Sequence, residues 1–529
     1  MIRLSHTGAF LLFAGILSHS ILAQEEPGRG PTLPFRVEYR IKSFPDAPPL
    51  VGLQAYSATM IDGKILILGG RKQGLHYFKS LPEQNMPPEN TNNLILVIDP
   101  ASGKSWSYDV TALPQRLGDA IRSNNQQSWY DRQSDQWYIL GGYGWDRATS
   151  DMRTFPTMLR VSGRRLIAEL MAPNPNTNEA IEKLFELHED ERFAVTGGGL
   201  HRLDNNFYLV LGQRFDGQYS VFDPGTQRVA VRFKQKYTEE IRVFTLKPGT
   251  LQILSYGQLD SDDPTKPLHR RDGPILGTVD PSTGEPRIAA FGGVFVPGTT
   301  QGYTAPIYIY DGSDQPYYTI DTQVQQHFSQ YECPVLPIFD SESKAIYHIF
   351  FGGISHYFYG FDEMQMKVYQ KVTEDKRADG VPFIGNVSGM VQRADGSYDQ
   401  FILPDSLPRI AIPDDVKAIY FKDFRDYEVD TTNLYASSVE MIENSEAIDQ
   451  GFLSESGVVD LERMAPGQTI VAGYIYGGIA SVFPYALRPS QGTFPSNHLL
   501  EVTITRAFSQ ALPGSDGIPA EVTTQTPGR

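Results

Sequence analysis

The sequence predicts an all-β protein that is built from repeated units. Three observations lead to this prediction. The chain of 529 residues contains 48 Gly and 37 Pro, too many for a helical bundle, and 28 Tyr and 29 Phe, which supply buried area. Short apolar runs that end in paired glycines recur along the chain, and turn-forming Asp, Asn and Gly residues precede most of them. Length alone would suggest three or four domains, whereas the repeats favour one large domain.

The first 23 residues have the pattern of a secretory signal peptide. Arg3 lies in a polar start, residues 9–17 are apolar, and Ala23 offers a small residue before Gln24. The apolar stretch is too short to span a bilayer. We therefore expect cleavage near Ala23, export to the periplasm or the medium, and no membrane span in the mature chain.

The repeated unit is a buried strand that ends in glycine. Its copies lie at residues 64–70, 137–142, 207–213, 288–293, 347–353 and 472–478. The third copy reads Leu211-Gly212-Gln213, which we interpret as a variant with Gln for the second glycine. Each run is apolar, aromatic or β-branched, and the glycines permit positive φ or close backbone approach.

Further strands follow these runs. Residues 94–106 and 219–229 read as two strands joined by an Asp-Pro turn, and residues 389–398 read as an Asp-Gly hairpin. Each unit therefore has four expected strands.

Four strands with a double glycine ending the second resemble the kelch repeat, as in the kelch and galactose-oxidase type of β-propeller. More narrowly, the chain resembles exported bacterial propellers of unassigned function. The resemblance covers residues 35–506 and implies a single six-bladed β-propeller, between a flexible segment at 24–34 and a flexible tail at 507–529. The units are longer than the ~50 residues of a kelch repeat. Only Trp106 stands at the expected tryptophan position, so we expect long inter-strand loops.

The long gap before the last double glycine requires an interpretation. Residues 382–403 read as the last two strands of the fifth unit, and residues 417–421 as the start of the sixth. Residues 423–456 then form an acidic insertion with a short helix at 438–448, and residues 457–461 return to strand. A degenerate seventh blade inside the insertion is the alternative.

The two ends of the repeat region are expected to pair. Residues 35–42 alternate between polar and apolar, as an edge strand does. They could form the outer strand of the blade that contains residues 499–504, which would leave the ring without open edges.

Charge and cysteine count exclude several classes of function. The net charge of −16 disfavours nucleic acid and anionic membranes as partners. Cys333 is the only cysteine, which excludes an internal disulfide and CxxC-type zinc sites. The sequence has no P-loop, HExxH, GxSxG or dinucleotide-binding motif. We expect a monomer without cofactor or metal.

Candidate ligand-binding residues lie mainly in the loops after the glycine pairs, which the symmetry of a ring would bring to one face. They are Arg71, His76, Tyr143, Trp145, Asp146, Arg214, Asp216, His269, Arg270, Arg271, His356 and Tyr357. Arginine and histidine bind hydroxyl and carboxylate groups, and aromatic rings stack on sugars. The alternative for each residue is structural, because arginine can join neighbouring blades by bonding their carbonyls.

The function that these features favour is non-catalytic binding of a glycan, a small carboxylated ligand or a protein. The alternative is a sugar epimerase or mutarotase, which needs only an acid/base pair in a pocket. A copper oxidase of the galactose-oxidase type is less favoured, because it needs a Cys–Tyr crosslink and two histidines. Tyr331 lies close to Cys333 in sequence, but no spacing specifies such a site.

Overall fold

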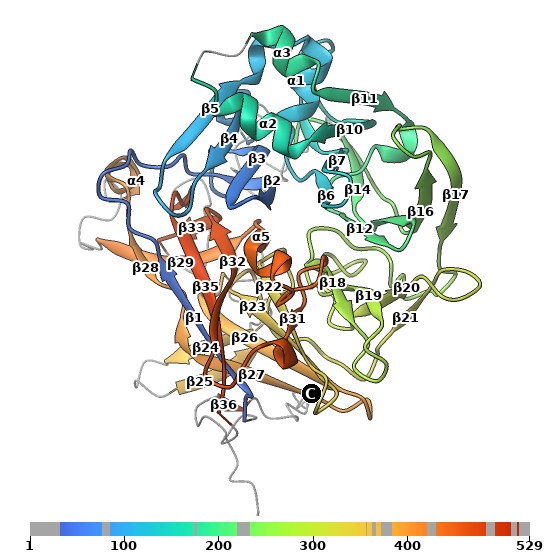
Figure 1. Ribbon diagram of the computed structural model, residues 1–529, viewed down its shortest axis with the longest axis vertical. Helices are drawn as coiled ribbons and strands as arrows, with labels where there is room; N and C mark the ends of the chain where they lie inside the picture. The colour runs from blue at the N-terminus through green and yellow to red at the C-terminus, as the bar shows by residue number, and fades with distance from the viewer. Residues whose placement is uncertain are drawn as a thin grey trace, which may run out of the picture.

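The computed structural model describes residues 32–76, 85–173, 177–219, 233–355, 357–361, 367–371, 383–420, 430–482, 492–508 and 516–517. Strands dominate, and nearly all of them pair in antiparallel sheets (Figure 1). This architecture is consistent with an all-β propeller. None of the helices in these residues is long and apolar enough to cross a membrane.

Six sheets share a core of four antiparallel strands, and we number them along the chain. The strands follow their sequence order in sheets 1 to 5, whereas β1 is the outer strand of sheet 6. Sheet 1 contains β2 (Gln54–Ile61), β3 (Lys64–Arg71), β4 (Leu94–Ile98) and β5 (Ser105–Asp109). Sheet 2 contains β6 (Gln127–Asp131), β7 (Gln136–Leu140), β10 (Thr157–Ser162) and β11 (Phe185–Glu189). Sheet 3 contains β12 (Gly199–Leu203), β13 (Asn206–Val210), β16 (Ile241–Leu246) and β17 (Ile253–Leu259).

The second half of the chain continues the pattern. Sheet 4 contains β18 (Ile275–Val279), β19 (Pro286–Ala290), β20 (Ile307–Tyr310) and β21 (Tyr317–Ile320). Sheet 5 contains β22 (Val335–Asp340), β23 (Ala345–Phe351), β26 (Asn386–Arg393) and β27 (Tyr398–Ser406), extended by β31 (Val459–Asp460) and β36 (Asp516–Gly517). Sheet 6 contains β30 (Ile442–Glu443), β32 (Thr469–Tyr476), β35 (Leu499–Arg506) and β1 (Phe35–Ile41).

The six sheets follow one another around a common centre (Figure 1). Their first strands face this centre: β2 contacts β6, and contacts continue in order through β12 and β18 to β22. The first strand of sheet 6, β30, contacts β2. The order of the sheets in space is therefore their order in the sequence.

Among the described residues, the first and last long strands pair with each other. β1 runs antiparallel to β35, from Phe35 opposite Arg506 to Ile41 opposite Leu500. The ring of Phe35 packs edge-on against Tyr347 of sheet 5, with 5.1 Å between the ring centroids. The pairing predicted between residues 35–42 and 499–504 is confirmed.

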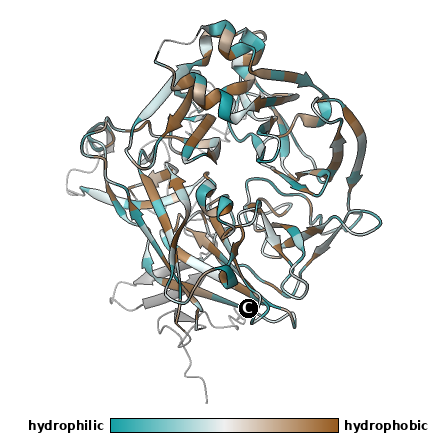
Figure 2. Cartoon of the chain, viewed as in Figure 1, coloured by the Kyte–Doolittle hydropathy of each residue, from teal (hydrophilic) through white to brown (hydrophobic). Residues whose placement is uncertain are grey.

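Hydrophobic cores lie between neighbouring sheets. In β7, Trp137 and Ile139 face the core shared with sheet 1, and Tyr138 and Leu140 face the core shared with sheet 3. This alternation follows from the two-residue period of a strand. A strand packed on both faces reads as a continuous apolar run, which is why these second strands were recognisable in the sequence. Hydrophobic residues accordingly concentrate on the strands in Figure 2.

The glycine pairs join each sheet to the next. The second glycine of each pair has a φ of 82–92° and donates its N–H to a carbonyl of the following sheet's leading segment, at 2.6–3.2 Å. The first glycine lies against the same carbonyl. A Cβ on Gly69, Gly141, Gly292, Gly352 or Gly477 would lie only 2.0–2.4 Å from that oxygen. At these five pairs both positions therefore favour glycine for close approach as well as for φ.

The third copy departs from the pattern in a different way from that predicted. Gly212 has a φ of 89° and donates to the carbonyl of Arg270, so it is the second glycine of its pair. Leu211, with a φ of 60°, stands where the other sheets have the first glycine. The variant is thus Leu for the first glycine, and the interpretation of Gln213 as a replaced glycine is wrong.

Additional hairpins follow the glycine pairs of several sheets, and a further sheet lies beside them. The hairpins are β8 (Tyr143–Asp146) with β9 (Asp151–Thr154), β14 (Gln213–Gly217) with β15 (Phe233–Tyr237), and β24 (Tyr357–Phe361) with β25 (Lys367–Lys371). The further sheet consists of β28 (Arg409–Ala411), β29 (Thr431–Ser437), β33 (Ile479–Ser481) and β34 (Thr493–Pro495). Long inter-strand connections were predicted, and several of those described contain these hairpins.

The helices are short and lie in the connections. They are α1 (Gln115–Ile121), α2 (Gly163–Leu170), α3 (Asn178–Glu182), α4 (Asp414–Tyr420) and α5 (Ser445–Asp449), with single turns η2 (Pro88–Asn90), η3 (Val110–Ala112), η4 (Glu191–Phe193) and η6 (Leu461–Arg463). The side chains of Ser162 and Thr177 cap α2 and α3 by accepting a backbone N–H.

The sixth unit begins differently from the prediction. Residues 417–420, predicted as a strand, belong to α4, and Phe421 lies outside the described residues. Pro413 precedes this helix and Asp414 and Asp415 occupy its first turn, both of which favour a helix start. The first strand of sheet 6 is instead the two-residue β30.

The rest of the insertion predicted at 423–456 also has different secondary structure from the prediction. The helix predicted at 438–448 is only the short α5 at 445–449, and β29 crosses residues 431–437. Of residues 457–461, Val459 and Asp460 form β31, which pairs in parallel with β22 of sheet 5.

The hairpins predicted at 94–106 and 389–398 are confirmed, whereas most of 219–229 lies outside the described residues. The predicted signal peptide also lies outside them.

Candidate functional site

A closed ring of six backbone hydrogen bonds surrounds the centre of the molecule. Its members are Ala55, Asn125, Gly197, Asp272, Glu332 and Ser438, one at the start of each sheet. Each donates its N–H to the carbonyl oxygen of the preceding member, and Ala55 donates to Ser438, at distances of 2.7–3.2 Å. Five of the six have positive φ, so the segments leading into the sheets share one turn geometry. We call this feature the central ring.

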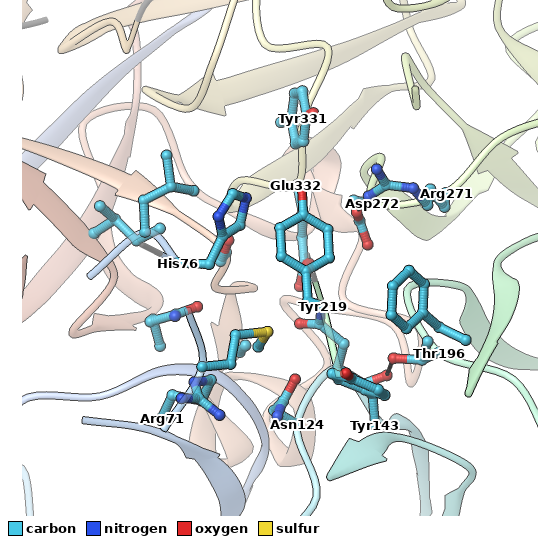
Figure 3. Close-up of a pocket in the computed structure, with 18 of the residues that line it drawn as sticks. Arg71, His76, Asn124, Tyr143, Thr196, Tyr219, Arg271, Asp272, Tyr331 and Glu332 are labelled. Carbon is cyan, nitrogen blue, oxygen red and sulfur yellow. Dashed lines mark hydrogen bonds and ion pairs between the residues drawn. The ribbon is translucent and has the colours of Figure 1, made fainter. Parts of the chain in front are cut away.

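A cavity of about 290 Å³ lies at the central ring, and segments from all six sheets line it. The residues directly after the glycine pairs contribute Arg71, Tyr143, Gln213, Ile354 and Ile479, and Phe295 lies two residues after its pair. Central-ring members Ala55, Asn125, Asp272, Glu332 and Ser438 also line it. The predicted convergence of the loops after the glycine pairs is therefore confirmed. We call this cavity the ring pocket (Figure 3).

Two arginines enter the ring pocket. Arg71 is only 2% exposed, and its guanidinium donates to the side-chain oxygen of Gln73 at 2.7 Å and to the carbonyl of Pro87 at 3.2 Å. Arg271 forms an ion pair with the neighbouring Asp272 and lies 5.6 Å from the ring centroid of Phe295. The two arginines thus bring positive charge to opposite sides of the pocket (Figure 3).

Aromatic side chains form much of the wall. Tyr219 lies across the pocket in Figure 3, with its ring 4.4 Å from His76 and 5.7 Å from Phe215. Burial raises the pKa of Tyr219, so its hydroxyl stays protonated at neutral pH. Tyr143 donates its hydroxyl to the carbonyl of Gly217 at 2.6 Å. This wall offers apolar ring faces beside a few polar groups, as small-molecule sites do.

A second cavity, of about 110 Å³, lies between the first strands of the sheets. Glu332, Glu440 and Glu443 line it, together with Trp129 and His201. Burial raises the pKa of Glu332 well above its usual range, and the nearby charges of Glu440 and Asp272 raise it further. Burial also raises the pKa of Glu440 to about 7. Glu332 lines both cavities, so it lies where the ring pocket meets this channel cavity.

Four of the residues predicted from the sequence line the ring pocket: Arg71, His76, Tyr143 and Arg271. Trp145 and Asp146 do not, although they lie on β8 directly after Tyr143. Trp145 packs beside Tyr143 and Phe215, and the Asp146 carboxylate accepts the N–H of Ala148 at 2.8 Å. These two side chains hold the hairpin rather than face the pocket.

Arg214 and Asp216 also have structural partners. They lie on β14, where Arg214 bonds Asp216 at 2.7 Å and Glu191 at 2.5 Å. Asp216 accepts the N–H of Thr154 at 3.2 Å, which links two neighbouring hairpins. Alternation along β14 puts Gln213 and Phe215 on the pocket side, so Arg214 and Asp216 point elsewhere.

The three residues at 269–271 have three different roles. His269 pairs with Glu239 at 2.5 Å and stacks on Tyr237 at 3.7 Å, outside the ring pocket. Arg270 is 2% exposed and donates to the carbonyls of Pro267, Gly292 and Ala305 at 2.7–3.0 Å. Arg270 bonds backbone carbonyls, as the structural alternative expected, but those of sheet 4 and its leading segment rather than those of neighbouring sheets. Only Arg271 lines the pocket.

The last two candidates lie at the fifth sheet. Tyr357 begins β24, with its ring 4.4 Å from that of His327, and does not line the ring pocket. His356 lies outside the described residues.

The residues missed by the sequence prediction lie mostly before the first strands. Asn124, Asn125, Thr196, Asp272, Tyr331 and Glu332 all line the pocket. Asn125 and Asp272 have φ values of 49° and 51°, a conformation that asparagine and aspartate tolerate. The Asn- and Asp-containing segments just before the first strands of sheets 2 and 4 were therefore an available signal.

The described residues contain no group of three or more His, Cys, Asp or Glu that could hold a metal ion. Cys333 is 3% exposed, and burial raises the pKa of its thiol. Tyr331 lines the ring pocket, but Cys333 lines the channel cavity instead.

No family model and no curated protein matches the chain. Among solved structures the chain is similar to the protein YjhT, at a TM-score of 0.44 and 8% sequence identity. The match covers 89% of this chain and 99% of that chain. It agrees only loosely with a propeller-like fold and carries no inference about function.

Proposed function

We propose that the chain is a six-bladed propeller of kelch type, with each of the six sheets as one blade. The central ring supports this count, because it closes after six members with one from each sheet. The described part of the insertion at 423–456, which could have held a seventh blade, contributes β29 to the further sheet and β30 to sheet 6.

We propose that this propeller is an exported binding protein whose ligand occupies the ring pocket. The observation that carries the proposal is that segments of all six sheets meet at one cavity of about 290 Å³. A cavity near this size suits a small molecule or the end of a glycan, whereas a protein partner would need a larger surface. Arg71, His76 and Arg271 can bind hydroxyl or carboxylate groups, and Tyr219 can pack against a ring.

The test is to fill the pocket. Leu75 lines the cavity, so Leu75→Trp is expected to abolish binding of any small ligand that a screen of glycans and organic acids identifies by thermal shift. Leu254→Trp is the matched control, because Leu254 lies on β17 and is 61% exposed. Equal binding by both variants would show that the ligand binds elsewhere.

A sugar isomerase is the second candidate, and Glu332 is the observation that favours it. A half-buried carboxyl with a raised pKa beside a pocket keeps its proton to higher pH and can act as a proton donor. Glu332→Gln keeps the size of the side chain and removes that capacity. Anomer interconversion or epimerisation of reducing sugars, followed by NMR, would then be lost while binding remained. Binding without any turnover in the unmodified protein would contradict the isomerase and support the proposal of a binding protein.

A further inference from the structure

The side chain of Asn124 is the least explained polar group at the ring pocket. Asn124 is 2% exposed and lines the cavity, and its amide points into it (Figure 3). Its backbone is satisfied by two hydrogen bonds to Tyr143, at 2.8 and 3.0 Å. Within the described ranges its side-chain Nδ2 is buried without a hydrogen-bond partner. Buried amides normally have partners, because leaving one unpaired costs free energy.

Two further oxygen atoms in residues that line the pocket also lack a hydrogen-bond partner. Oδ1 of Asn125 and Oδ1 of Asp272 are buried, and neither has a partner among the residues that the structure describes. Both residues belong to the central ring and line the same pocket. The other oxygen of Asp272 is held by Arg271. Three buried polar atoms of the pocket lining therefore lack a partner: one amide nitrogen and two acceptor oxygens.

The chemistry of these groups limits what can satisfy them. A carboxamide has an acceptor and a donor side by side, and its complement is a group with a donor and an acceptor at the same spacing. The two bare oxygens need donors, so a ligand carboxylate at this position would be repelled by Asp272. An amide-type edge supplies both a donor and an acceptor, and Tyr219 and Tyr143 can pack against the rest of the ligand.

We propose that the ring pocket recognises an amide-bearing ligand through Asn124, with Asn125 and Asp272 accepting further N–H or O–H donors. The proposal rests on the binding function proposed above and names the chemistry of its ligand. Two sources carry this chemistry: an acylated amino sugar and a heterocyclic or aromatic amide.

The test compares four probes by isothermal titration: N-acetylglucosamine and nicotinamide, which carry an amide, and glucose and benzoate, which do not. We expect one of the amide probes to bind, and to bind at least about ten-fold more weakly to Asn124→Ala. Which of the two binds identifies the source. Asn178→Ala, an exposed asparagine on α3, is the matched control and should bind as the unmodified protein does.

Three outcomes would overturn the proposal. If glucose or benzoate binds in the pocket and neither amide does, the amide inference fails while the binding function stands. If an amide probe binds equally to the unmodified protein and to Asn124→Ala, Asn124 is not its partner. If none of these probes and no glycan or acid in the wider screen binds, both proposals fail. Asn124→Ala retains the backbone bonds to Tyr143, and its urea midpoint, compared with that of the unmodified protein, shows whether it is folded.

Discussion

Gly142 donates its backbone N–H to the carbonyl oxygen of Val195 at 2.8 Å and so joins sheet 2 to sheet 3. The preceding Gly141 lies against the same carbonyl, where a Cβ would lie 2.0 Å from the oxygen. The same arrangement recurs between the other neighbouring sheets, except that Leu211 replaces the first glycine between sheets 3 and 4. The double glycine is thus a contact between repeats as well as a turn within one.

Gly141→Ala should therefore destabilise the protein more than a positive φ alone explains. Gly249→Ala is the matched control, since Gly249 has a φ of 73° and an added Cβ there would have no neighbour within 4 Å. The control should cost about 1–2 kcal/mol, the usual cost of this conformation for an L-residue. Gly141→Ala should cost at least about 2 kcal/mol more, because sheets 2 and 3 must separate locally. Urea unfolding measures both, and equal losses would contradict the contact between sheets.

Removal of residues 35–43 should abolish cooperative unfolding. The deletion exposes the edge of β35 and removes Phe35, which is 1% exposed. Arg36→Ala, at a side chain that is 63% exposed, should change the free energy of unfolding by less than about 0.5 kcal/mol. Differential scanning calorimetry gives the comparison, and an unchanged transition for the deletion would refute ring closure by β1.

Arg270→Met should destabilise the fold, whereas Arg214→Met should have little effect. Arg270 satisfies the buried carbonyls of Pro267, Gly292 and Ala305, which lose their donor on substitution. We expect a loss of about 3 kcal/mol or more for Arg270, against about 1 kcal/mol or less for the partly exposed ion pairs of Arg214. Denaturant unfolding distinguishes the two, and a small effect at Arg270 would favour a binding role.

His348 should make the protein less stable in acid. Burial, with a contribution from the charge of Arg287, lowers the pKa of His348 from 6.5 to about 3. Its folded pKa lies below its unfolded pKa, so the unfolded state binds more protons below pH 6.5. Stability is then lost as pH falls from 6.5 towards 3, by up to about 1.4 kcal/mol per pH unit. His348→Gln should flatten the pH dependence of the urea midpoint in this window, and an unchanged slope would contradict the assignment.

The shifted pKa of Glu440 should change the pH dependence of stability in the direction opposite to that of His348. Burial raises its pKa from 4.5 to about 7, so the folded state holds the proton more tightly than the unfolded state. The stabilising effect is complete below pH 4.5 and is lost as pH rises through 7. Solvent screening in the channel cavity reduces the size of the effect. Glu440→Gln should therefore gain more stability at pH 8 than at pH 5.

The repeat pattern was accessible from the sequence because each second strand is buried on both faces. Runs such as residues 137–140 are continuously apolar for this reason, and their terminal glycines mark the contact with the next sheet. The sixth unit was harder, since its first strand has only two residues and gives no periodic signal. Helix α4 was not predicted because Val416, Ile419 and Tyr420 also fit a strand, although the acidic first turn favours a helix.

The location of the ring pocket could be predicted from the sequence, but only some of the residues that line it could be. Symmetry indicates that loops after the glycine pairs converge, but strand alternation decides which of their side chains face inward. Along β14 it selects Gln213 and Phe215 over Arg214. Asn124 and Glu332 could not be assigned from the loops after the glycines, because they precede first strands and reach the pocket through the central ring.

The pairing of β1 with β35 also sets the order of events during biosynthesis. The first strand of the ring has no partner until residues 499–506 have been made. At typical synthesis rates of about 5–20 residues per second, β1 waits on the order of half a minute or longer. Sheets 1 to 5 can assemble in sequence during that time, but the ring cannot close. A polar–apolar strand with charged Arg36, Glu38 and Arg40 on its outer face is suited to remain soluble while it waits.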